Sequence, residues 1–173
     1  MSLIVTSCSL VAGNIISSYV QKKALSKLFD ITLHKTIVSG LYNLIGSVTS
    51  IKELNHSDLN NIIIELDLDF KLELIQSFLD DITNILNPID ETVTHVQTNI
   101  TRSLTVSLNY LNKIITEIYT LINTVKDKIE YHKTKYFNYY RTLDITQDLN
   151  KLRQEHDILM SRFDLIIKII IKK

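Results

Sequence analysis

The chain has 173 residues, of which 45% are hydrophobic and 22% are charged, and its 19 acidic residues balance its 19 basic ones. The apolar fraction suffices for a buried core and excludes a chain that is disordered throughout, and the length fits a single domain. A net charge of zero makes nucleic acid an unexpected partner, because proteins that bind nucleic acid usually carry an excess of basic residues.

The choice among similar residues is skewed. Isoleucine occurs 27 times and alanine twice, and lysine outnumbers arginine by 15 to 4. This bias in residue usage predicts an AT-rich genome, such as that of a large DNA virus, a protist or a reduced bacterium. The single cysteine, Cys8, excludes an intramolecular disulfide bond.

The first twenty residues lack the basic start of a secretory signal, and no run of about 18 apolar residues is present. We therefore expect a cytoplasmic protein, with membrane association as an alternative. Apolar residues at helical spacing predict helices over 3–28 and 33–48 within an N-terminal part, 1–50. Residues 51–68 are predicted to form a connection, with a short helix over 57–64 that Ser57 and Asp58 cap.

Residues 65–74 alternate strictly between polar and apolar side chains, which is typical of a strand. Apolar residues also recur at helical steps from Leu68 to Leu86, and Asp69 can cap a helix. We favour a helix over 69–86, the first of the core helices in 69–173, and keep the strand as the alternative.

The next start signal is Asn87-Pro88, an N-cap followed by a proline suited to the first helical position. Neither proline nor glycine occurs after Pro88, and apolar residues at helical steps continue to about Arg141. One helix over 88–141 would be about 80 Å long. That length is excessive for a domain of this size, so a kink or break is predicted at 101–107, which is rich in serine and β-branched residues.

Asp144-Ile145-Thr146-Gln147 resembles a capping box and predicts the start of the last helix. The short linker near Thr142 predicts that the last two helices fold back on one another. Together these elements predict an all-α fold: an antiparallel helical bundle of four or more helices in one domain, 1–173, with a long C-terminal helical hairpin.

The last helix supplies the main predicted interaction residues. Its apolar positions alternate in steps of three and four, as in a coiled coil. His156 within this row is either a pH-sensitive position or an ordinary histidine. The segment 163–171 is apolar almost all round and is predicted to be deeply buried, to engage a second subunit or to contact an acidic membrane. The interaction residues are Leu149, Leu152, His156, Leu159, Phe163, Ile166 and Ile170.

A second predicted interaction region is the aromatic and basic segment 131–141, which includes Tyr136, Tyr139 and Tyr140. Such segments fill the wide end of a bundle, anchor a protein partner, or contact lipid or nucleic acid. No phosphate loop, nucleophile elbow or zinc-protease motif is present in the sequence. We therefore predict a protein that is not an enzyme and that has no metal and no cofactor.

The stretch 9–21, Ser-Leu-Val-Ala-Gly-Asn-Ile-Ile-Ser-Ser-Tyr-Val-Gln, resembles the first helix of HeLo-type domains. These are the helical cell-death bundles of fungal incompatibility proteins and of mixed-lineage-kinase-like pseudokinases. The chain departs from that pattern in lacking an attached kinase or prion-like region. The resemblance implies a bundle that oligomerises and perturbs membranes through Leu10, Val11, Ile15, Ile16 and Tyr19.

The predicted function is therefore that of a helical interaction module that binds a protein partner or forms a homo-oligomer. The alternative is a membrane-active bundle that inserts an N- or C-terminal amphipathic helix.

Overall fold

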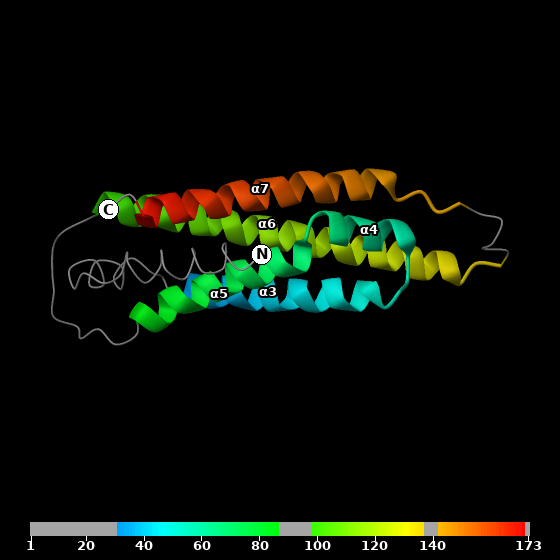
Figure 1. Ribbon diagram of the computed structural model, residues 1–173, viewed down its shortest axis with the longest axis horizontal. Coiled ribbons are helices and arrows are strands. Elements are labelled where there is room, and N and C mark those ends of the chain that lie inside the picture. Colours follow the sequence, from blue (N-terminus) through cyan, green and yellow to red (C-terminus); the bar gives the residue numbers. More distant parts are fainter. Residues whose placement is uncertain (1–30, 87–97, 137–141, 172–173) are drawn as a thin grey trace.

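A computed structural model describes residues 31–86, 98–136 and 142–171 of the chain. Within these ranges the protein is all-α, as predicted, and contains no strand. Helix labels follow Figure 1. The described residues form five helices: α3 (Ile31–Lys52), α4 (Ser57–Glu65), α5 (Leu68–Leu86), α6 (Thr98–Lys133) and α7 (Thr146–Ile171).

The long helices lie side by side along the longest axis of the molecule (Figure 1). Helix α6 is central, because it packs along α3 on one side and along α7 on the other. Consecutive long helices run in opposite directions, so α6 and α7 form the predicted antiparallel hairpin. With 36 residues, α6 is about 54 Å long.

The first and third long helices, α3 and α6, run parallel to each other (Figure 1). Ser47 donates a hydrogen bond to Asn123 Oδ1 at 3.4 Å, and Lys126 Nζ donates to Ser50 Oγ at 2.8 Å. Both contacts join residues 76 positions apart, which fixes the register along this pair.

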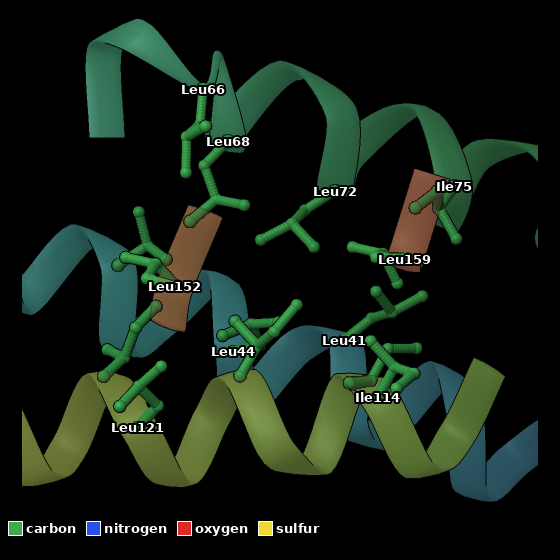
Figure 2. Close-up of a cluster of buried hydrophobic side chains, with 14 of the residues drawn as sticks. Leu41, Leu44, Leu66, Leu68, Leu72, Ile75, Ile114, Leu121, Leu152 and Leu159 are labelled. Atoms are coloured by element: carbon green, nitrogen blue, oxygen red, sulfur yellow. The ribbon is translucent and has the colours of Figure 1, made fainter. Parts of the chain in front are cut away.

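The core lies where the four long helices meet, and α4 adds to it near the end of α3. Figure 2 shows leucine and isoleucine side chains from α3, the α4–α5 region, α6 and α7 pointing toward one another. Each helix presents an apolar face to this core, as expected from its three-and-four spacing. The labelled members are Leu41, Leu44, Leu66, Leu68, Leu72, Ile75, Ile114, Leu121, Leu152 and Leu159, all of them buried.

Two residues with a positive φ connect the first three described helices. Asn55 (φ 52°) follows α3, and Asp67 (φ 49°) separates α4 from α5. Asn and Asp are the non-glycine residues that adopt this left-handed conformation most readily. Their positions allow the chain to reverse after α3 and then to bend between α4 and α5.

The alternating segment 65–74 is helical from Leu68 onward, so the strand alternative is wrong. The short helix predicted over 57–64 is α4, and it lies inside the region assigned to a connection. Its N-cap is His56, whose side chain makes no capping hydrogen bond, rather than Ser57. Helix α3 also extends to Lys52, beyond the predicted end at residue 48.

Helix α6 is uninterrupted through 101–107, so the break predicted there is absent. It ends at Lys133, before the predicted end near Arg141. The start signal at Asn87-Pro88 lies outside the described residues. The predicted start of α7 is confirmed at Asp144, whose Oδ1 accepts a hydrogen bond from the Thr146 backbone N–H at 3.0 Å. This bond lowers the pKa of Asp144.

Candidate functional site

The row of apolar residues predicted as an interaction surface on α7 lies inside the chain's own bundle. All seven residues are buried, and they pack against α4, α5 and α6 rather than facing solvent. In the folded chain they are therefore not available to a second molecule. The row consists of Leu149, Leu152, His156, Leu159, Phe163, Ile166 and Ile170.

The aromatic and basic segment is only partly described. Tyr136 is 88% exposed, and Tyr131 is also exposed. Lys135 Nζ lies 4.2 Å from the centroid of the Tyr131 ring, and its hydrogen bond lowers the pKa of that tyrosine. Tyr136 is thus exposed to solvent, while Tyr139 and Tyr140 lie outside the described residues.

A different group of exposed apolar residues lies on the outer side of the α6–α7 hairpin. It comprises Val106 and Tyr110 on α6 and Ile158 and Leu165 on α7, each between 40% and 50% exposed. The Arg162 guanidinium lies over the Tyr110 ring, 5.3 Å from its centroid, and so joins the two helices. We call these five residues the outer face.

The outer face is continuous because of helix geometry. Val106 lies one turn before Tyr110, and Ile158 and Leu165 lie one turn on either side of Arg162. Tyrosine and arginine are the residues enriched at protein interfaces. The seven-residue spacing of Ile158 and Leu165 in the sequence is the signal that could have identified this face.

A group of polar contacts joins α4 and α5 to α7 on the opposite side of α7. Arg153 donates two hydrogen bonds to the Glu65 carboxylate, at 3.1 and 2.9 Å, which lower the pKa of Glu65. Lys71 Nζ lies 3.1 Å from His156 Nε2. His156 is only 4% exposed, and its burial lowers its pKa; the hydrogen bond to Asp157 raises the pKa in part, and the Lys71 charge lowers it further.

The described residues do not bring together three or more histidine, cysteine or acidic side chains that could hold a metal ion. No helix in 31–86, 98–136 or 142–171 is long and apolar enough to cross a membrane. The N-terminal residues predicted to act on membranes, Leu10, Val11, Ile15, Ile16 and Tyr19, lie outside the described residues.

Comparison with known proteins gives one informative similarity. No protein-family model and no solved structure matches the chain. The chain is 32% identical over 160 residues to the uncharacterized protein L717 of Acanthamoeba polyphaga mimivirus, an alignment that covers 79% of this chain and 78% of the viral protein. This viral relative agrees with one of the sources predicted from composition. The chain belongs to the same protein family as mimivirus L717.

Proposed function

We propose that the protein is a non-enzymatic helical interaction module that associates with a second copy of itself through the outer face. The observation that carries this proposal is the exposure of Ile158 and Leu165 on α7, in a face that continues onto α6 at Tyr110. The spacing of its members supports a self-complementary surface. If two α7 helices pack antiparallel about Ser161 and Arg162, Ile158 of one copy lies opposite Leu165 of the other, and the reverse.

The charged residues beside Ile158 and Leu165 are also arranged so that they can pair with those of a second copy. Asp157 and Lys168 are exposed and lie eleven residues, or about three turns, apart on one edge of the outer face. Antiparallel pairing brings Asp157 of one copy toward Lys168 of the other on both sides of the two-fold axis. Ser161 at the centre is small and permits close approach. Because the net charge of the chain is zero, two copies do not repel each other at long range.

The test is the mass of the full chain in solution, measured by light scattering at several concentrations. We expect twice the 20.0 kDa of one chain. Replacing Ile158 and Leu165 together by glutamate places charges in the outer face and should give a monomer. Tyr42→Glu is the matched control, because Tyr42 is exposed on α3, away from the outer face, and its variant should remain a dimer.

A charge exchange tests the antiparallel geometry. Lys168→Asp should weaken the dimer because it places two acidic residues together, and adding Asp157→Lys should restore it. If the unmodified chain is a monomer at every concentration, the self-association proposal fails.

Membrane activity is the alternative outcome, and flotation with anionic liposomes distinguishes it. A monomer that floats with the lipid would favour insertion of an N- or C-terminal helix, as the HeLo resemblance implies. A dimer that stays with the aqueous fraction would favour the interaction module. Cytoplasmic location is part of the same proposal.

A further inference from the structure

Helices α4 and α5, residues 57–86, form an arm that packs on α3 and covers the part of the apolar row of α7 that α6 does not cover. Figure 2 shows Leu68 and Leu72 of this arm on the side of the core facing Leu152 and Leu159 of α7. Farther along, Phe78 meets Phe163 edge-on with ring centroids 5.3 Å apart. The arm is shorter than α6 and bends at Asp67, whereas α6 packs along both α3 and α7.

Between these apolar contacts lies one buried ionisable side chain, His156. Its neutral ring is fully satisfied when Lys71 Nζ donates to Nε2 and the Nδ1–H donates to Asp157 Oδ1, at 3.1 and 3.2 Å. A second proton on the ring would occupy Nε2, which is the acceptor for Lys71. Protonation therefore removes this hydrogen bond and leaves two positive groups 3.1 Å apart in the contact between α5 and α7.

The acidic residues nearby do little to compensate for that charge. The side chain of Asp157 is 79% exposed, so water screens its attraction for the ring. Glu65, at the end of α4, is engaged with Arg153. One carboxylate oxygen of Glu155 is buried without a partner among the described residues. Glu155 lies seven residues from both Asp148 and Arg162, which contact α6, so it faces α6 rather than the arm.

Other charged groups on the helices around α7 form ion pairs away from His156. The ion pairs are Lys52 of α3 with Asp69 of α5, Lys128 of α6 with Asp148 of α7, and Lys113 with Glu117 within α6.

We propose that His156 is an acid-sensitive latch, and that its protonation releases the α4–α5 arm from α7 and exposes the side of the apolar row of α7 that the arm covers. Helices α3, α6 and α7 stay together, because α6 packs extensively along both α3 and α7. All the residues involved belong to one chain, so the latch does not depend on self-association.

The direction of the pH effect follows from the lowered pKa of His156 in the folded chain. The closed state has its full stability above about pH 6.5, the ordinary histidine pKa of the open state. As the pH falls below that value, the open state takes up a proton more readily than the closed state, and the arm is destabilised. The closed state continues to lose stability until the pH falls below the pKa of His156 in that state.

The test is amide hydrogen exchange of the full chain at pH 7 and pH 5, with each rate divided by the intrinsic rate at that pH. We expect α5 amides to lose protection at pH 5, by about tenfold for each unit of pKa lowering, while α6 amides keep theirs. His156→Gln should abolish the loss, because glutamine can keep both polar contacts but does not titrate.

Two further variants keep the test decisive if His156→Gln folds poorly. Lys71→Met removes the positive charge that opposes protonation and should reduce the acid effect. His34→Gln is the matched control, since His34 is 7% exposed and its Nε2 contacts the Leu79 carbonyl oxygen at 3.2 Å. This variant should retain the acid effect, because it leaves His156 and Lys71 unchanged. Unchanged α5 protection at pH 5, or equal loss in α5 and α6, would overturn the latch.

Discussion

Two parallel helix pairs of the bundle, α3–α6 and α5–α7, both contain buried leucine side chains but differ in their polar contacts. Along α3–α6 the contacts come from hydroxyl, amide and lysine groups, such as Ser47 with Asn123 and Lys126 with Ser50. Along α5–α7 the central contact is the buried ring of His156. Hydroxyl and amide groups keep their roles between pH 5 and 8, whereas histidine changes its charge there. The two helix pairs are therefore expected to respond differently to acid.

The largest expected effect tests whether the two interiors are in fact equally well packed. Leu44 on α3 and Leu159 on α7 are both fully buried. Replacing either by alanine should lower the free energy of unfolding by about 2–5 kcal/mol, because each change removes buried methyl groups and leaves a cavity. Urea denaturation at pH 7 measures both losses. A much smaller loss for Leu159→Ala would mean that the arm packs loosely on α7. The two helix pairs would then differ in their packing as well as in their polar contacts.

A smaller effect is expected from the aromatic pair that is particular to α5–α7. Phe78 and Phe163 meet at 90° with centroids 5.3 Å apart. A double-mutant cycle with leucine at each position should give a coupling free energy of about 0.5–1.5 kcal/mol. Unfolding in urea of the two single variants and the double variant supplies the cycle. Additive losses would show that the ring geometry contributes nothing beyond burial.

The smallest effect concerns the two glycines of α3. A Cβ at Gly46 meets nothing within 4 Å, so Gly46→Ala should raise the free energy of unfolding by about 0.5–1 kcal/mol through helix propensity. A Cβ at Gly40 would lie 3.3 Å from Ile115 Cγ2 on α6, so the same gain is offset by crowding. Thermal unfolding of the two variants compares them. Equal gains would indicate that α3 and α6 approach less closely than described.

Much of the fold could be predicted from sequence because local signals and burial agree. In α7, the acidic cap at Asp144 and the three-and-four spacing both specify the same helix. In α6, serine and β-branched residues suggested a break, but Leu104 and Leu108 are buried in the core there, and tertiary packing outweighs weak propensity.

The interaction surface was harder to predict, for a physical reason. A row of apolar residues shows that a helix face is covered but does not show what covers it. The row from Leu149 to Ile170 is covered by α6 and, on another side, by α4 and α5 of the same chain, and α4 lies within the predicted connection. Ile158 and Leu165 are exposed only because no described helix covers that side of α7.

The 76-residue separation between contacting positions of α3 and α6 also bears on the order of folding. The hairpin contact of Lys128 with Asp148 closes a loop of only 20 residues. Closing the longer loop costs about 1 kcal/mol more in chain entropy, since the cost grows with the logarithm of loop length. We therefore expect α6 and α7 to pair before α3 docks, with φ-values higher at Leu121 than at Leu44; the reverse order of φ-values would contradict this. An α3 that docks last leaves the side of α6 around Ile115 exposed in the folding intermediate, and that side is then where misassembly with another chain would begin.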